Sequence, residues 1–205
     1  MLRRQLNLKK YYMVLFLCII SIWLAYVYNF NKKSLALDEI PIESHSIEEK
    51  VEFQHNYSYG SYLDGYAIKV NDYQLIDTKE YLKKYNLSVD DFQNCPERVG
   101  LVNISIFNDG NYNGYEKPEG LLLDNLWLYG IDYYCNQNTD FYKLENPQLG
   151  DSNGIQLNEG EERNVVLVYN FFKKDFTAGN WMNMDKLKMD ILLTAYPVQK
   201  EIVLQ

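Results

Sequence analysis

A run of eighteen residues without a charge, residues 11–28, constrains this chain more than any other feature of its sequence. At about 1.5 Å per residue a helix over this run is roughly 27 Å long, and Asn29 and Phe30 extend it to about 30 Å, the thickness of a bilayer's hydrocarbon layer. A backbone in lipid must satisfy its own hydrogen bonds. The run therefore predicts a single transmembrane helix over residues 11–30.

The basic residues predict the orientation of this helix. Segment 1–10 contains four basic residues, whereas only Lys32 and Lys33 follow the helix closely. Because positive charge stays on the cytoplasmic side, residues 1–10 are expected to form a cytoplasmic tail and the body to lie outside the cell. The helix then acts as a signal anchor that holds a single-pass protein in the cell membrane. The alternative is a signal peptide cleaved after Ala36, which also exports the body.

The exported body is acidic. Residues 34–205 contain 14 basic and 28 acidic residues, a net charge of −14, whereas the first 33 residues carry +6. A surface of this charge repels a phosphate backbone, so no nucleic-acid partner is expected. The bilayer, reached through residues 11–30, is the one partner that the sequence predicts directly.

Residues 31–62 show no sustained hydrophobic period, and residues 54–62 are rich in Tyr, Ser, Asn and Gly. This composition predicts an extracytoplasmic stalk, with the folded domain over residues 63–205. The two histidines of the chain, His45 and His55, both lie in the predicted stalk. Catalysis by histidine requires an imidazole held within hydrogen-bond reach of its partners, so neither such catalysis nor a histidine metal site is expected.

Alternation of apolar and polar residues predicts strands through most of the domain. The expected strands are residues 66–70, 102–106, 121–129, 131–135, 164–172, 187–195 and 202–204. One short helix is expected after a cap at Asp77 or Thr78, and residues 136–163 are expected to form a long loop. Six or more strands with one short inserted helix predict a mainly β fold, a two-sheet sandwich.

Two cysteines, Cys95 and Cys135, lie in the exported part, whereas Cys18 lies in the apolar run. Two cysteines in an oxidising compartment predict a disulfide. Closing a loop of about forty residues stabilises by roughly 4 kcal/mol on the chain-entropy model. Two separate buried thiols are the alternative. The chain has no C-x-x-C motif, so neither redox chemistry nor a zinc knuckle is indicated.

No catalytic or cofactor-binding motif is assembled in the sequence, and no cofactor is expected. Paired carboxylates for glycoside hydrolysis are available among residues 90, 91, 109, 116, 119, 124, 132 and 140, although solvated surface charge explains these acids equally well. Residues 109–114, Asp-Gly-Asn-Tyr-Asn-Gly, resemble the first half of a calcium loop. Position 12 of that loop is Gly120 where a bidentate Glu belongs. A turn between two strands explains the same residues.

Aromatic residues, most of them tyrosines, gather in two stretches of the sequence. The first contains Tyr57, Tyr59, Tyr62 and Tyr66, and the second contains Tyr112, Tyr115, Trp127, Tyr129, Tyr133 and Tyr134. Aromatic rings exposed on a surface hold glycans or peptides. Packing in the core and on strand faces is expected to account for most of these rings.

Three segments resemble a known family: GEERNVVLVY at 160–169, LLTAYPVQKEIVL at 192–204, and the stretch from Asp64 to Phe92. They are similar to small surface proteins of Gram-positive bacteria, a domain-of-unknown-function family with an N-terminal membrane anchor. The resemblance covers residues from about 60 to 205. It implies an immunoglobulin-like sandwich outside the cell and supplies no catalytic residue.

Three functions are compatible with these observations. The first is a non-enzymatic binding or assembly module of the cell envelope, with an envelope protein or glycan as its partner. The second is an envelope hydrolase that uses paired carboxylates. The third is a small membrane accessory protein that works through its helix, for example in peptide-toxin immunity or export.

Overall fold

The computed structural model describes residues 12–13, 15–28, 40–58, 61–130, 132–150 and 152–205, and the chain forms two units, Met1–Glu39 and Ile40–Gln205. In the first unit, residues 15–28 are helical. Among the residues that the structure describes, no helix combines the length and the apolar character that a membrane crossing requires. The predicted tail 1–10, both ends of the predicted span 11–30, and stalk residues 31–39 lie outside the described residues.

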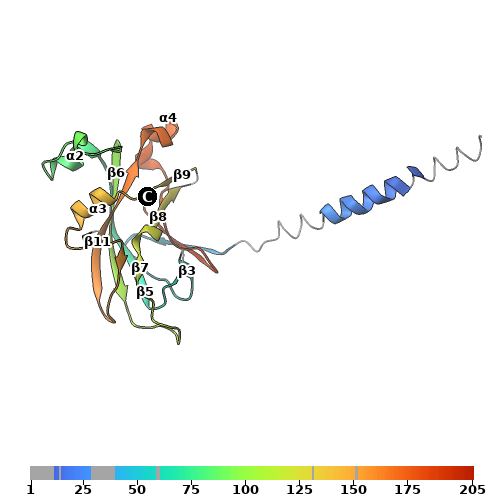
Figure 1. Ribbon diagram of the computed structural model, residues 1–205, viewed down its shortest axis with the longest axis horizontal. Helices are drawn as coiled ribbons and strands as arrows, with labels where there is room; N and C mark the ends of the chain where they lie inside the picture. The colour runs from blue at the N-terminus through green and yellow to red at the C-terminus, as the bar shows by residue number, and fades with distance from the viewer. Residues whose placement is uncertain (1–11, 14, 29–39, 59–60, 131, 151) are drawn as a thin grey trace, which may run out of the picture. The chain divides into compact units, whose positions relative to one another are not determined.

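The second unit is mainly β, as predicted, and two larger sheets contain most of its strands (Figure 1). Sheet A has the order β1 (Ile42–Ser46), β13 (Gln199–Val203), β12 (Asp190–Thr194), β8 (Trp127–Gly130) and β9 (Tyr133–Cys135). Sheet B has the order β11 (Glu162–Phe171), β6 (Arg98–Asn108), β5 (Tyr66–Asp77) and β2 (Lys50–Glu52). Two small ladders pair β7 (Leu121–Leu122) with β10 (Gly154–Ile155) and β3 (Tyr57–Ser58) with β4 (Ser61–Tyr62). The pairing of β1 with β13 is parallel.

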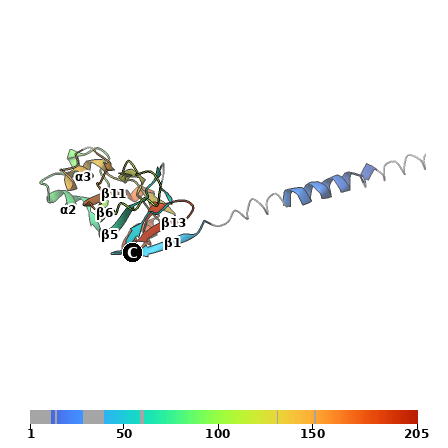
Figure 2. The same cartoon turned by 90° about the horizontal axis from the view of Figure 1, so that it is seen from below.

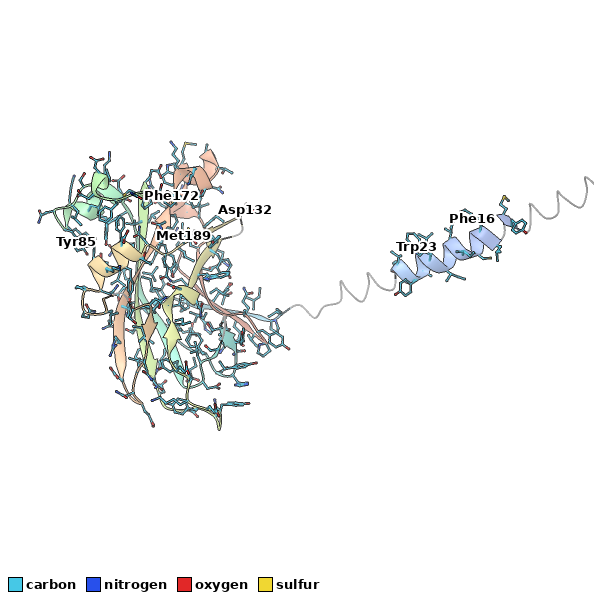
Figure 3. All side chains as sticks on the ribbon, viewed as in Figure 1. Phe16, Trp23, Tyr85, Asp132, Phe172 and Met189 are labelled. Carbon is cyan, nitrogen blue, oxygen red and sulfur yellow. The ribbon has the colours of Figure 1, made fainter. Side chains whose placement is uncertain are left out.

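One hydrophobic core joins the two sheets. On β6 the side chains of Val102, Ile104 and Ile106 are fully buried. They belong to the same cluster as Ile191 of β12 and Ile202 of β13, which come from sheet A. Each buried aliphatic side chain contributes about 1.5–3 kcal/mol, so this shared cluster holds the sheets together. Figure 3 labels one member, Met189, whose sulfur accepts a hydrogen bond from the hydroxyl of Tyr73 at 3.1 Å.

Three α-helices accompany the sheets in the described part of the second unit, where the sequence predicts only one. The predicted helix is α2 (Thr78–Lys83), and the side chain of Asp77 caps it by accepting a hydrogen bond from the backbone N–H of Lys79. The other two are α3 (Thr139–Glu145) and α4 (Ala178–Met182), and four 3₁₀ turns occur as η1 (Val89–Asp91), η2 (Leu123–Asn125), η3 (Lys173–Asp175) and η4 (Met184–Lys186). Helices of seven and five residues are too short to show a hydrophobic period.

The helices α2 and α3 lie against sheet B on the side away from β1 and β13 (Figure 2). A second hydrophobic cluster fills this contact, and it contains Leu82 of α2, Phe141 of α3 and Val168 of β11. Sheet B is therefore covered on both sides, which explains why β6 and β11 bury residues on both of their faces.

The folded unit begins at Ile40 rather than at residue 63. Residues 42–62, which the sequence assigns to a stalk, form β1 to β4, and Val51, Phe53 and Ser58 are buried. These strands have two to five residues and each buries few side chains, so no period is visible. The partner of β1 is β13, 157 positions later in the sequence, and no local sequence pattern predicts such a pairing.

The predicted central strand 121–129 is interrupted. It divides into β7, the 3₁₀ turn η2 and β8, and these segments join different ladders. Leu121, Leu123, Leu126 and Leu128 are all buried, because the turn adds one residue to the alternation and keeps the four leucines on the inner side. The sequence predicts a strand buried on both faces, whereas in the structure this run buries its leucines on one side only.

Backbone and one side chain close the edge of β11 that faces away from β6. The N–H of Asn138 donates to the carbonyl of Val168 at 2.7 Å, and the N–H of Asn170 donates to the carbonyl of Asn136 at 2.8 Å. Next to these bonds Asn146, which is 1% exposed, donates from Nδ2 to the carbonyl of Val166 at 2.8 Å and accepts from the N–H of Val166 at 3.0 Å. Its Nδ2 also donates to the carbonyl of Tyr142 at 2.8 Å, so this amide continues the edge pairing and fixes α3 beside β11.

Candidate functional site

Two adjoining hollows open at the edge of sheet A, beside β8, β9 and α3. One has a volume of about 380 Å³ and the other of about 270 Å³. Both are lined by Asp124, Gln137 and Thr139, so we treat them as one groove. The first hollow adds Leu126, Trp127, Tyr134, Cys135 and Asn136, and the second adds Leu123, Tyr142, Lys143, Gly150 and Asn153.

Two partly exposed aromatic rings form one wall of the groove. Trp127 of β8 is 40% exposed and Tyr134 of β9 is 58% exposed. Their ring centroids lie 6.0 Å apart at an interplanar angle of 40°. The indole N–H of Trp127 donates to the carbonyl of Asp124 at 3.1 Å, which fixes the orientation of the ring. The pair is therefore a positioned apolar surface that solvent reaches.

The floor of the groove is held by hydrogen bonds to backbone. Nε2 of Gln137 donates to the carbonyls of Leu123 at 2.6 Å and of Leu126 at 3.2 Å. The hydroxyl of the fully buried Tyr169 donates to the same carbonyl of Leu126 at 2.6 Å. These bonds anchor η2 to Gln137 and to Tyr169 of β11, so the protein's own hydrogen bonds hold this side of the groove in place.

The helix α3 supplies polar groups on the opposite wall. Its cap is Asn138, whose side-chain oxygen accepts a hydrogen bond from the N–H of Phe141 at 2.9 Å. The cap places Thr139 and Lys143 at the groove, while the carboxylate of Asp124 accepts a hydrogen bond from the side-chain amide of Asn153. Hydroxyl, amide, ammonium and carboxylate groups thus surround an aromatic wall.

A second cluster of ionisable groups lies on sheet A, and its two carboxylates are nearly buried. Asp190 and Glu201 are 4% and 5% exposed. Nζ of Lys188 lies 3.0 Å from Oδ2 of Asp190 and 3.6 Å from Oε1 of Glu201. Ser44 donates to Glu201 at 2.6 Å, and the hydroxyl of Tyr129 also donates to it.

The two carboxylates have opposite pKa shifts. Burial raises the pKa of Asp190, because Lys188 only partly offsets the loss of water and Glu201 adds a like charge. Burial alone also raises the pKa of Glu201, but hydrogen bonds from Ser44 and Tyr129, with the charge of Lys188, outweigh it and leave that pKa below its usual range. A split of this kind occurs in acid–base pairs. Neither carboxylate lines the groove, and both ion-pair with Lys188.

The cysteines predicted to pair are both free thiols. Cys135 of β9 is buried in the core between the sheets, and Cys95 packs against the cluster under α2. No disulfide joins them, because they belong to clusters on opposite sides of sheet B. Burial raises the pKa of Cys135 to about 12 and also raises the pKa of Cys95, so both thiols favour the protonated form.

The histidines lie in the folded unit and not in a stalk. Nδ1 of His45 on β1 lies 2.8 Å from the carboxylate of Glu49. Nδ1 of His55 lies 2.9 Å from the buried carboxylate of Asp64, and its ring stacks between Tyr62 and Tyr115 at centroid distances of 4.1 and 3.7 Å. Sequence reasoning missed this stack. The only signal was the richness in tyrosine on both sides of His55.

The calcium-like segment 109–114 forms a turn. The carboxylate of Asp109 pairs with Nζ of Lys50 at 2.8 Å, and the side chain of Asn111 accepts from the N–H of Asn113 at 3.4 Å. Gly110, Asn113 and Gly114 have positive φ angles, which the Asn-Gly sequence accommodates. Over the described ranges, no three His, Cys, Asp or Glu residues are placed to hold a metal ion.

Comparison with known proteins yields one match. Residues 42–200 match the model of a protein family described as a domain of unknown function, DUF5028. No curated protein and no solved structure matched the chain. The match covers most of the folded unit and confirms the resemblance to a family of unknown function that the sequence shows.

Proposed function

We propose that this chain, which belongs to the DUF5028 family, is a membrane-anchored, non-enzymatic binding module of the cell envelope that holds a glycan in the groove beside Trp127. In this proposal residues 11–30 span the membrane, the N-terminus is cytoplasmic, and the unit Ile40–Gln205 lies outside the cell as an immunoglobulin-like sandwich. The anchor rests on the apolar run and its basic flank, and the sandwich on the core that the two sheets share.

The observation that carries the binding function is the pair Trp127 and Tyr134 above a preformed polar groove. A sugar ring has an apolar face that stacks on an aromatic ring and a rim of hydroxyls that exchange hydrogen bonds with side-chain amides and carboxylates. The groove offers both kinds of group, with Asp124 and Asn136 beside the rings. Its volume of about 380 Å³ is within the range of small-molecule sites.

The residues that line this groove favour binding over catalysis. Asp124 is the one carboxylate among those that line its two described hollows, whereas hydrolysis of a glycosidic bond normally uses two. The carboxylates with divergent pKa values, Asp190 and Glu201, are engaged with Lys188 outside the groove. A glycan seated on Trp127 therefore meets groups that orient it and none that cleave it.

The experiment is a binding screen of the full chain, solubilised in detergent, against an array of envelope oligosaccharides, followed by calorimetry with the best binder. We expect a dissociation constant in the range of about 10 μM to 1 mM, which corresponds to a binding free energy of roughly 4–7 kcal/mol. Two rings that each contribute about 1–3 kcal/mol, as in the stacking of a base on an aromatic ring, together with hydrogen bonds reach this range. Trp127→Ala should weaken binding at least tenfold. Tyr196→Ala, which removes an exposed ring outside the groove, should leave it unchanged.

Two outcomes oppose the proposal. Binding that is insensitive to Trp127→Ala would place the ligand elsewhere, and no binding across the array would remove the glycan. The hydrolase alternative predicts cleaved products that disappear in Asp190→Asn. The accessory-protein alternative predicts loss of function when residues 11–30 are replaced with an unrelated anchor, whereas a binding module keeps its function.

A further inference from the structure

Exposed apolar side chains gather at one end of the folded unit. Among its described residues, ten large hydrophobic side chains are exposed. Six of them lie around the β3–β4 hairpin and the point where the chain enters β1, namely Ile40, Ile42, Tyr57, Tyr62, Tyr115 and Tyr196. Single exposed apolar residues need no explanation, but a group of six on one end of a small domain does. We call this group the entry-end patch.

Backbone pairing holds the members of the patch together. Tyr57 of β3 lies opposite Tyr62 of β4, and Tyr57 also forms a bridge with Tyr196. The N–H of Gln199 donates to the carbonyl of Pro41 at 2.9 Å, which ties the segment after Tyr196 to the first residues of the unit. The hairpin, the end of β12 and the chain entry therefore form one surface.

The stack on His55 adds Tyr115 to the patch. Tyr62, His55 and Tyr115 lie nearly parallel, with interplanar angles of 5° and 10°, and the rings of Tyr57 and Tyr62 meet edge to face. The carboxylate of Asp64 holds the imidazole in place, with 2.9 Å between Oδ2 of Asp64 and Nδ1 of His55. Four rings thus form a continuous row from β3 to the loop after β6.

We propose that the entry-end patch docks on the lipid–water interface of the membrane that anchors the chain. This inference rests on the anchoring in the proposed function. The apolar run ends at residue 30 and the folded unit begins at Ile40, so nine residues separate them. At about 3.3–3.6 Å per residue this tether reaches no further than roughly 30 Å. Because the tether joins the unit at Ile40, the entry end can be no further than this distance from the end of the apolar run.

The chemistry of the patch suits this occupant. Tyrosine rings prefer the headgroup level of a bilayer, where the ring meets hydrocarbon and the hydroxyl meets water. The ring row consists of three tyrosines and one histidine, whereas residues 40–205 carry 14 basic and 26 acidic residues, a net charge of −12. Docking is therefore driven by the rings and opposed by charge on anionic lipid. It should be stronger on zwitterionic vesicles, and salt should strengthen it on anionic ones.

The test uses the full chain reconstituted in phosphatidylcholine vesicles whose headgroups carry a spin label that quenches fluorescence. A dye is placed at Ser61→Cys in the β3–β4 hairpin or, as the distant control, at Lys174→Cys in η3, both exposed positions. The background carries Cys18→Ser and Cys95→Ser, and the buried Cys135 is retained. We expect quenching at position 61 to exceed that at position 174 at least twofold.

Tyr62→Ser combined with Tyr196→Ser should bring the quenching at position 61 down to the control value. The matched pair Tyr134→Ser and Met182→Ser, which removes exposed apolar groups outside the patch, should not. A circular dichroism melt first shows that each variant is folded. For folded variants, equal quenching at the two dye positions overturns the proposal, and so does quenching at position 61 that the double patch variant leaves unchanged.

Quenching of Trp23 by lipids brominated on their acyl chains, judged against Trp23→Phe, reports the anchor separately. If Trp23 is quenched and the dye at position 61 is not, docking fails and anchoring stands. If Trp23 is not quenched, the anchoring on which both proposals rely is overturned.

Discussion

Removing the side chain of Asn146 tests how the structure builds its groove. This residue pairs with Val166 at the edge of β11 and fixes α3, which supplies Thr139, Tyr142 and Lys143 to the groove. Asn146→Ala removes three hydrogen bonds and leaves both the N–H and the carbonyl of Val166 without that partner.

The expected loss follows from the number of bonds. A hydrogen bond contributes about 0.5–1.5 kcal/mol net, so three of them contribute about 3 kcal/mol. The residue is only 1% exposed, so water replaces the lost partners poorly. For a unit of this size a loss of 1 kcal/mol lowers the melting temperature by about 2–4 °C, so the unit should melt about 6–12 °C lower.

The assay is thermal and urea unfolding of the full chain in detergent, monitored by the far-ultraviolet circular dichroism signal of the β-strands. Asn158→Ala is the matched control, because Asn158 is exposed and its side chain donates only to Glu161. That control should change the stability by less than about 0.5 kcal/mol. A loss below about 1 kcal/mol in Asn146→Ala, or one equal to the control, would show that β11 and α3 do not depend on this amide.

Further predictions concern ionisation. The pKa of Glu201 is lowered on folding, so its charge stabilises the fold above the unfolded value of about 4.5, and this contribution is lost as pH falls through the folded value. Glu201→Gln should therefore lower the melting temperature at pH 7, and its melting temperature should converge with that of the wild type as pH falls below the folded pKa of Glu201. The pKa of Asp190 is raised, so its ionisation costs stability as pH rises above its unfolded value of about 3.8, and Asp190→Asn should flatten this decline in stability. A thiol titration of the unfolded, unreduced chain should find three thiols, and a single thiol in that titration would demonstrate a disulfide between Cys95 and Cys135. A titration of the native chain at pH 8 should leave Cys135 unreacted.

Long strands are the part of the fold that the sequence predicts well. The alternation in β6 and β11 places Val102, Ile104, Leu167 and Tyr169 on the inner face, where the structure has them. The alternation works because each of these strands pairs over ten or more residues with antiparallel neighbours. A side chain that turns inward at every second position then leaves a clear pattern.

Short and non-local elements escape sequence reasoning. The helix α3 has seven residues, and its role becomes visible only through Asn146 and its bonds to β11. The strand β1 looks like a linker because its core contact is made through β13. For the same reason the stack on His55 is hidden, since Tyr62, Tyr115 and Asp64 reach it from different segments.

The groove was predictable only in part. Trp127 and Tyr134 belong to the aromatic residues that the sequence picks out, and Asp124 to its available acids. Their meeting depends on η2, which interrupts the expected strand and brings the carbonyl of Asp124 to the indole of Trp127. A turn of three residues within an apolar run has no signature in residue type.

The parallel pairing of β1 with β13 determines when the fold can be completed. Ile42 and Gln199 are partners across 157 positions of chain. The strand β1 therefore cannot pair with β13 until the 157 residues that follow Ile42 have been synthesised. The entropic cost of closing so long a loop must be met before the contacts between β1 and β13 can stabilise the sheet, so sheet A assembles late and slowly. Until then its unpaired edge is the part of the nascent molecule most exposed to chaperones and to aggregation.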